Sequence, residues 1–160
     1  MMFVDLEASG LGEDSWPIEI GFAWIEGGRV RWASKLIRPE PGWPRSAWSS
    51  ESAVVHGITM TELHRAEDAA DVARWAAAVM GNRVVVSDAP SYDGVWLDRL
   101  LAAAGLVERP PLRDFDVLVS RRHRWPELER VYAELDATPP PHRAGPDAAR
   151  LAAAWRAGIG

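Results

Sequence analysis

A double glycine between two long apolar segments is the feature that most constrains how this chain folds. Residues 17–26 (PIEIGFAWIE) and 29–38 (RVRWASKLIR) are rich in β-branched and aromatic residues, and Gly27-Gly28 stands between them. Two glycines in this position are typical of a tight β-hairpin, because the turn requires positive φ angles. The sequence therefore predicts an antiparallel pair of strands near the start of the chain.

The rest of the chain alternates between strand-like and helix-like segments. Residues 2–6 and 83–87 are short and apolar, as expected of strands, and residues 112–119 fit either a fifth strand or the start of a helix. Helices are expected in residues 54–63, as two short pieces, and in residues 68–80, 92–104, 125–135 and 146–157. Because strands come first and then alternate with helices, we expect an α/β fold with a mixed central sheet of about five strands flanked by helices.

The size and composition fit a single domain over residues 1–160. Of these 160 residues, 48% are hydrophobic, which is enough to fill one packed core. The sequence has no run of about 18 apolar residues, and its N-terminus lacks the basic and then apolar pattern of a signal peptide. We therefore expect a cytoplasmic protein with no membrane partner.

Charge and cysteine content limit the chemistry that the chain can support. The absence of cysteine excludes disulfides and thiolate metal sites. A bound metal ion would be held by Asp, Glu or His, and oxygen ligands favour Mg²⁺ or Mn²⁺. The net charge of −5 argues against a protein that coats nucleic acid by overall electrostatic attraction, but is compatible with an enzyme that binds it at a local metal site.

Asp5 and Glu7 form the first candidate site. Residues two apart on a strand point to the same face, so these carboxylates are expected a few ångströms apart. Two bare carboxylates this close repel one another, and a divalent cation would remove that penalty. Taken alone, the pattern is common and more often reflects a surface acid beside an acid that caps a turn, here at Ser9-Gly10.

Two further acids lie in segments that open helices. In HRAGPD, Pro146 fits a first helical position with Gly145 as the cap, which places Asp147 in the first turn, where the helix dipole favours an anion. His142 precedes this helix, and a loop histidine next to a carboxylate suits general-base chemistry as well as a solvated surface position. Asp93 falls near the start of an amphipathic helix, where its role could be limited to that of an N-cap.

Four segments together resemble motifs of the DEDDh family of 3′–5′ exonucleases, which includes the proofreading subunit of bacterial DNA polymerase III, ribonuclease T and oligoribonuclease. VDLEASGL (residues 4–11) is similar to the first motif, and SYDGVWLDRLL (91–101) to the second, in which an aromatic-Asp pair opens a helix. HRAGPDAARLAAA (142–154) resembles the third motif, and VVHGIT (54–59) resembles a non-catalytic turn common in the family. The order and separations agree, so the resemblance covers nearly the whole chain.

The resemblance implies a ribonuclease H-like fold and a two-metal mechanism. Two Mg²⁺ or Mn²⁺ ions would be bound by Asp5, Glu7, Asp93 and Asp147, and His142 would be the general base that takes a proton from the attacking water. The substrate would be the 3′ end of single-stranded DNA or RNA, and the product a nucleoside 5′-monophosphate. Some members of the family act as dimers, so the resemblance leaves a homodimer open.

The chain departs from the family pattern at two places. The family often has His-Asn before the second motif, where this chain has residues 87–90 (SDAP), and Thr-Thr after the first motif, where it has Ala8-Ser9. Asp88 could replace a substrate contact or add a like charge near the site. These departures favour, as an alternative, a weakly active or inactive exonuclease-like module that binds nucleic acid or docks a partner. A metal phosphohydrolase that acts on small nucleotides is a third hypothesis.

Other residues have two interpretations each. Trp43 and Trp48, in a Pro-rich loop, could stack on a base, although packing of the loop is the simpler role. The basic run Arg121–Arg124 could follow a phosphate backbone or be a solvated patch, and His56 is expected to order the turn before Gly57. Five tryptophans in periodic segments are expected in the core: Trp24, Trp32, Trp75, Trp96 and Trp155.

Overall fold

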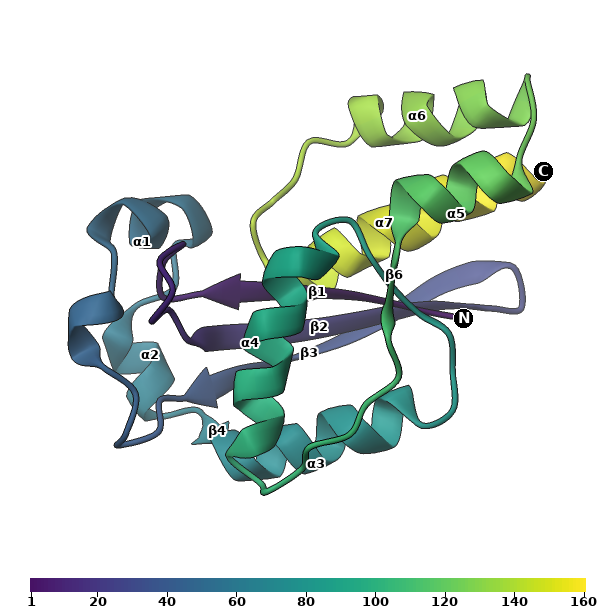
Figure 1. Ribbon diagram of the computed structural model, residues 1–160. Coiled ribbons are helices and arrows are strands. Elements are labelled where there is room, and N and C mark those ends of the chain that lie inside the picture. The colour runs from purple at the N-terminus through teal and green to yellow at the C-terminus, as the bar shows by residue number, and fades with distance from the viewer.

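A six-stranded sheet forms the centre of the computed structural model, which describes residues 1–160 (Figure 1). The spatial order of the strands is β4-β3-β2-β1-β5-β6. Their bounds are β1 Met2–Ala8, β2 Pro17–Glu26, β3 Arg29–Arg38, β4 Glu67–Asp68, β5 Val85–Ser87 and β6 Leu112–Asp114. The first three strands are antiparallel neighbours, whereas β5 runs parallel to β1, β6 parallel to β5 and β4 parallel to β3. The expected mixed sheet is therefore confirmed, with one strand more.

The double-glycine hairpin has the expected bounds. Gly27 and Gly28 have φ angles of 56° and 73°, the positive values that a two-residue hairpin turn needs. From this turn the register runs from Glu26 opposite Arg29 to Glu19 opposite Leu36. The hairpin thus fixes which residues of β2 lie at the far end of the sheet.

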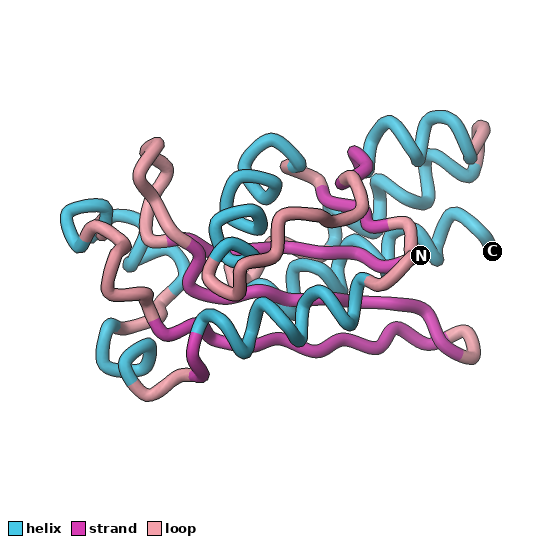
Figure 2. The backbone as a smooth tube through the Cα atoms, turned by 60° about the horizontal axis from the view of Figure 1, so that its bottom comes forward, coloured by secondary structure: helices cyan, strands magenta, loops and turns pink.

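Helices cover both faces of the sheet (Figures 1 and 2). The helices α3 (Ala69–Met80) and α4 (Pro90–Ala102) pack on one face, and α7 (Ala144–Ile159) packs on β1, β2 and β3 on the other, together with α5 (Phe115–Arg122) and α6 (Glu127–Ala137). Three short helices complete the chain: η1 Arg45–Ala47, α1 Ser50–His56 and α2 Met60–His64. None of these helices combines the length and the apolar character that crossing a membrane requires.

Most expected elements are present, and the differences have local causes. Residues 112–119 form both a short strand, β6, and the start of α5, because Asp114 caps the helix by accepting a hydrogen bond from the Val117 N–H at 2.9 Å. Strand β4 is missing from the sequence-based prediction, since two residues, Glu67 and Asp68, are too few to show a periodic pattern.

The start of α7 differs from the prediction that Gly145 is its cap and Pro146 its first residue. The helix begins at Ala144, with Arg143 in the N-cap position. The reason is that two side chains accept backbone N–H groups upstream of Pro146. Glu19 accepts that of Ala144 at 3.1 Å, and Asp147 accepts that of Arg143 at 2.9 Å. The first turn is therefore fixed by one local contact, from Asp147, and one tertiary contact, from Glu19.

Strand β1 divides its side chains between the two faces. Its even-numbered residues Met2, Val4, Leu6 and Ala8 belong to the core beneath α3 and α4, whereas Phe3 belongs to the core beneath α7. Trp96 and Trp155 are buried as expected, and Trp24 and Trp75 pack at the edge of the core. The prediction was wrong for Trp32, which is 50% exposed because it lies beside the first turn of α7 and lines an open hollow between β3, α6 and α7.

Candidate functional site

The carboxyl end of β1 carries the first two acids. The alternation that buries Val4 and Leu6 under α4 turns Asp5 and Glu7 to the opposite face, where α7 begins. Both acids are half-buried. The expectation that they share a face is met.

The neighbouring parallel strand brings two more acids to the same edge. Because β5 pairs in parallel with β1, as Met2 with Val85 and Phe3 with Val86, both strands end on one side of the sheet. Extending this register by two residues places Asp88, which follows β5, beside Asp5. Asp88 was considered from the sequence only as a possible neighbour of the site, and the structure places it within the acidic group.

Asp93 reaches this edge from the first turn of α4. It is only 2% exposed, and it accepts a hydrogen bond from the Ser87 hydroxyl. Ser87 in turn accepts the Ala89 N–H at 3.0 Å, so the end of β5 and the start of α4 are tied together. Ala89 occupies the N-cap position, which excludes the interpretation of Asp93 as an N-cap. Its carboxylate is instead held toward the other acids.

Asp147 comes from the first turn of α7, as the sequence predicted. Its Oδ2 atom accepts the Arg143 N–H at 2.9 Å, while its Oδ1 atom is buried with no hydrogen-bond partner. A buried carboxylate oxygen without a partner carries a desolvation penalty that a bound cation would remove. Asp147 therefore presents one free oxygen to the acidic group.

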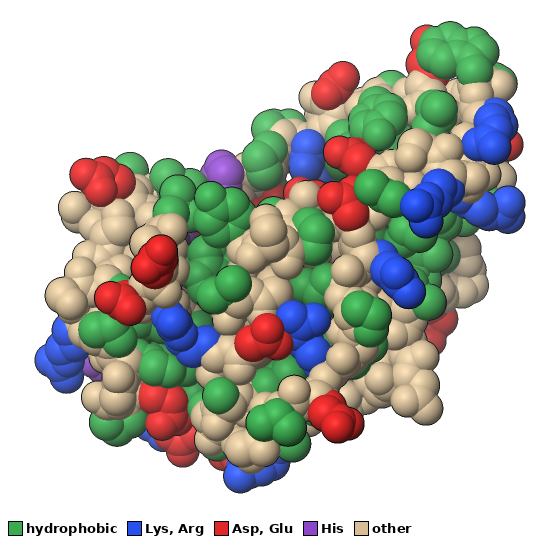
Figure 3. Space-filling view, viewed as in Figure 1, with side chains coloured by type: hydrophobic (Ala, Val, Ile, Leu, Met, Phe, Trp, Pro, Cys, Tyr) green, Lys and Arg blue, Asp and Glu red, His purple; other side chains and the backbone are tan.

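The acids form two triads that share Asp5. One triad is Asp5, Glu7 and Asp147, and the other is Asp5, Asp88 and Asp93; within each triad one ligand atom per residue lies within 4.8 Å of the others. Acidic side chains are exposed together above the start of α4 in the space-filling view (Figure 3). The five residues offer only oxygen ligands, the donors that suit Mg²⁺ or Mn²⁺. Segments more than 100 positions apart along the chain thus meet in a group with the donors for two adjacent cations.

Electrostatics shows how costly this arrangement is without a cation. Desolvation, followed by repulsion from Asp147 and Glu19, raises the pKa of Glu7 to about 8. Desolvation also raises the pKa of Asp93 to about 7, and desolvation with repulsion from its acidic neighbours raises the pKa of Asp5 well above its ordinary value. Carboxylates that resist ionisation in this way fit a site whose charge is completed by divalent ions.

His142 lies on the rim of the acidic group. It is exposed, and its φ of 55° lies in the left-handed region, which few residues other than glycine adopt. It lines a polar hollow of about 290 Å³ together with Asp5, Glu7, Asp88 and Asp147. It also lines an adjoining hollow of about 220 Å³, whose walls include Glu7, His56 and Trp96. His142 therefore stands between the acids and a second, less polar space.

His56 orders its turn as expected and also faces the second hollow. Its Nδ1 atom accepts the Ile58 N–H at 3.0 Å, and Gly57 takes a φ of 67° in the same turn. The imidazole is buried, with 5% exposed, and its Nε2 atom has no hydrogen-bond partner. A polar atom is thus available to a ligand in the wall of this hollow.

Three other residues with two interpretations are packed in the structure: Trp43, Trp48 and His123. Trp43 and Trp48 both pack on buried Trp16, with ring centroids 5.9 Å apart in each pair, so their loop is held by an aromatic cluster. In the basic run, Arg121, Arg122 and Arg124 are exposed, whereas His123 is buried against Trp155 with ring centroids 4.9 Å apart. The run is therefore not one continuous basic surface.

Sequence reasoning overlooked Glu19 and Arg143, which join β2 to the start of α7. Glu19 is 2% exposed and accepts hydrogen bonds from the Arg143 guanidinium at 2.9 and 3.0 Å. A signal was available, because Glu19 is the one charged residue among the apolar side chains of PIEIGFAWI. A lone acid in a segment predicted to be buried calls for a partner.

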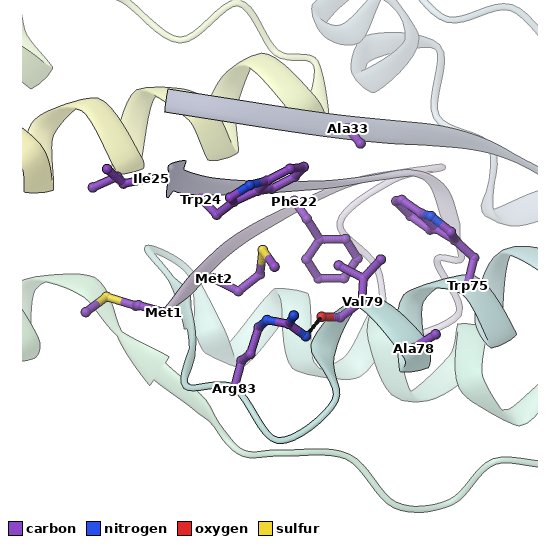
Figure 4. A pocket seen from close by; sticks show the side chains of 10 residues that line it. All are labelled: Met1, Met2, Phe22, Trp24, Ile25, Ala33, Trp75, Ala78, Val79 and Arg83. Carbon is purple, nitrogen blue, oxygen red and sulfur yellow. Dashed lines mark hydrogen bonds between the residues drawn. The ribbon is translucent and has the colours of Figure 1, made fainter. Parts of the chain in front are cut away.

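A large apolar cavity lies away from the acids (Figure 4). It has a volume of about 640 Å³ and opens between the sheet and α3, at the amino end of β1. Nine of its ten lining residues are hydrophobic, and the tenth is Arg83. Since it contains no carboxylate or histidine, it does not contribute to the acidic site.

The chain is similar in fold to solved structures of exonucleases. The chain is similar to E. coli exonuclease I in complex with an oligonucleotide, with a TM-score of 0.71 and 14% identity over 98% of this chain and 39% of that one. A 3′-exonuclease that recognises a histone mRNA stem-loop gives a TM-score of 0.69 and 14% identity, over 97% of this chain and 79% of the other. Exonuclease X in complex with 5′-overhanging duplex DNA gives a TM-score of 0.63 and 21% identity, over 99% of this chain and 90% of the other.

These likenesses establish the fold. The ribonuclease H-like fold expected from the sequence is confirmed, because the chain shares its fold with these exonuclease structures. The chain spans 39% of the length of exonuclease I. No protein-family model matches the sequence, and no curated protein matches it either.

Proposed function

We propose that residues 1–160 form a single exonuclease domain of the DEDDh type, which removes nucleotides from the 3′ end of single-stranded DNA or RNA with the help of Mg²⁺ or Mn²⁺. The observation that carries the proposal is the meeting of two acidic triads that share Asp5, with His142 on their rim. The cytoplasmic location expected from the sequence stays a prediction, as does a homodimer.

In this proposal four acids hold the metal ions. Asp5, Glu7 and Asp147 would bind one ion, and Asp5 and Asp93 would contribute to the second. Two bound ions would neutralise the carboxylates and stabilise the attacking and leaving oxygens of an in-line displacement at phosphorus. The free Oδ1 atom of Asp147 and the raised pKa values of Glu7 and Asp93 support these assignments.

His142 would act as the general base. Its exposed imidazole lines the polar hollow that the acids line, so a water molecule there can lie within its reach. A histidine at near-neutral pH can accept the proton of the attacking water and release it to solvent. The phosphodiester bond to the terminal nucleotide then breaks, and a nucleoside 5′-monophosphate leaves the site.

The hollow beside Glu7 would take the terminal nucleoside. Its walls combine apolar side chains, Leu11 and Trp96 among them, with the unpartnered Nε2 atom of His56. Apolar walls suit a base or sugar face, and a buried nitrogen without a partner gains a hydrogen bond when a polar ligand arrives. Its position next to Glu7 would place the scissile phosphate at the acids.

A digestion assay tests the proposal. The protein is incubated with a single-stranded oligonucleotide labelled at its 5′ end, in Mn²⁺ and in EDTA. We expect a ladder of shortened products in Mn²⁺ alone, and its loss in His142→Ala. His64→Ala, which alters an exposed histidine of α2, is the matched control and should leave the ladder unchanged. No ladder in Mn²⁺, with an active nuclease run alongside, would contradict the proposal.

The alternative is a weakly active module that binds nucleic acid. Asp88 favours it, because a fifth carboxylate in the acidic group adds negative charge where the phosphate must approach. A change in electrophoretic mobility of the oligonucleotide in Mn²⁺, without any shortening, would support this alternative over the exonuclease.

A further inference from the structure

Glu19 is a buried acid whose two carboxylate oxygens both accept hydrogen bonds. Its Oε2 atom accepts hydrogen bonds from the Nε of Arg143 at 2.9 Å and from the Ala144 N–H at 3.1 Å. Its Oε1 atom accepts from the second guanidinium nitrogen at 3.0 Å and from the Ser34 hydroxyl at 3.2 Å. This bidentate pairing fixes the Arg143 side chain in one orientation.

Small residues allow this contact. A Cβ atom at Gly21, two positions along β2 from Glu19, would collide with the backbone of Ala144 and Gly145. A Cβ atom at Gly145 would in turn collide with the ring of Trp32. The first turn of α7 therefore rests directly on the strand, within reach of the Glu19 carboxylate.

The residues that Glu19 holds adjoin two residues of the acidic site. The backbone N–H of Arg143 fixes the Oδ2 atom of Asp147, which leaves Oδ1 free toward the other acids. His142 precedes Arg143 and takes a left-handed conformation with a φ of 55°, which is unfavourable for a side chain other than glycine unless its neighbours are fixed.

We infer that Glu19 is a positioning residue for the proposed hydrolysis. Through Arg143 and the Ala144 N–H it holds the start of α7, so that His142 stays on the rim and Asp147 keeps one oxygen turned to the metal ions. Glu19 also pairs in register with Glu7 across β1 and β2. The inference rests on the proposed exonuclease function, and its test separates the two.

The test compares Glu19→Gln with Glu26→Gln. Both residues lie on β2, but Glu26 is exposed at the hairpin end of the strand, away from the start of α7, and pairs with Arg31. Mn²⁺ affinity is measured by titration calorimetry. Turnover is measured on a single-stranded oligonucleotide, and both measurements are made well below the melting temperature. For Glu19→Gln we expect Mn²⁺ affinity and kcat to fall by about 10- to 100-fold, the range for groups that orient metal ligands, with little change in KM. Glu26→Gln should match the wild type.

Arg143→Lys provides a second arm that keeps the charge but removes the two-pronged pairing. It should lower Mn²⁺ affinity and kcat as much as Glu19→Gln does. The double variant should lose no more than either single variant, because each substitution already breaks the same Glu19–Arg143 pair. If Glu19→Gln does not fold, Arg143→Lys decides, since it leaves Glu19 in place.

Three results would overturn the inference. Variants that are folded and keep wild-type Mn²⁺ affinity and kcat would overturn it, as would losses that multiply in the double variant. A wild-type protein that neither binds Mn²⁺ nor shortens the oligonucleotide would overturn the proposed function itself, and this inference with it.

Discussion

The two ends of strand β1 open onto two hollows of opposite character. At the amino end, Met1 and Met2 line the 640 Å³ apolar cavity beneath the sheet; at the carboxyl end, Asp5 and Glu7 line a 290 Å³ hollow in which seven of the eight lining residues are polar or proline. None of the candidate site residues lines the larger cavity. The candidate site is therefore distinguished by its convergent ionisable groups and not by its volume.

The largest expected effect comes from the carboxyl end. Asp5→Asn removes the acid that both triads share, so the rate of oligonucleotide shortening should fall by about 10²- to 10³-fold, as when one electrostatic stabiliser of a transition state is lost. The metal-free variant should melt at or above the wild-type temperature, because repulsion among the acids is reduced. If Asp5→Asn kept wild-type turnover, the acids at the carboxyl end of β1 would not be the catalytic site.

A substitution beside the cavity at the amino end of β1 should lower stability without affecting catalysis. Phe22 is fully buried beside the apolar cavity and packs edge-on against Trp75, with ring centroids 5.5 Å apart. Phe22→Ala should lower the free energy of unfolding by about 3–5 kcal/mol, measured by urea denaturation. Turnover by the folded protein should be unchanged at low temperature. Val107→Ala, at a 92% exposed position, is the control.

The pH dependence of stability sharpens the comparison further. The folded pKa values of Glu7, about 8, and Asp93, about 7, exceed their ordinary values of 4.5 and 3.8. Between these limits the folded state binds more protons than the unfolded state, so stability falls as pH rises. We expect the melting temperature of the metal-free protein to decrease from pH 5 to pH 8.

Mn²⁺ should reverse this trend, because it binds the ionised carboxylates of the folded state. At pH 8 millimolar Mn²⁺ should raise the melting temperature, by roughly 2–4 °C for each kcal/mol of binding free energy. The combined variant Asp5→Asn with Asp147→Asn should lose the rise. A melting temperature that does not respond to Mn²⁺ in the wild type would count against the acidic site.

The smallest effect is expected at Asp88. It is exposed and belongs to one triad only, so Asp88→Asn should weaken Mn²⁺ binding by at most about tenfold and leave the fold intact. Asp98→Asn, an exposed acid of α4 that pairs with Arg109, is the matched control. A complete loss of activity in Asp88→Asn would instead give this residue a role equal to that of Asp5.

Much of the fold could be predicted because it depends on local rules. Gly27-Gly28 and the flanking β-branched residues fixed both strands of the hairpin to the residue. The two-residue period placed Asp5 and Glu7 on one face, and the helix-start pattern placed Asp147 in a first turn. The exposed Trp32 shows the limit, since a periodic segment does not reveal how far the helices on that face cover each side chain.

The sequence by itself determined the segments, their periodicity and the acids that each segment carries, because these follow from backbone sterics and side-chain spacing over a few residues. Only the tertiary structure decided that β5 lies next to β1, which brings Asp88 beside Asp5, and that α7 begins at Ala144 on the Glu19 carboxylate. Strand neighbours and helix starts of this kind depend on contacts between residues far apart in the chain, and no local pattern encodes them.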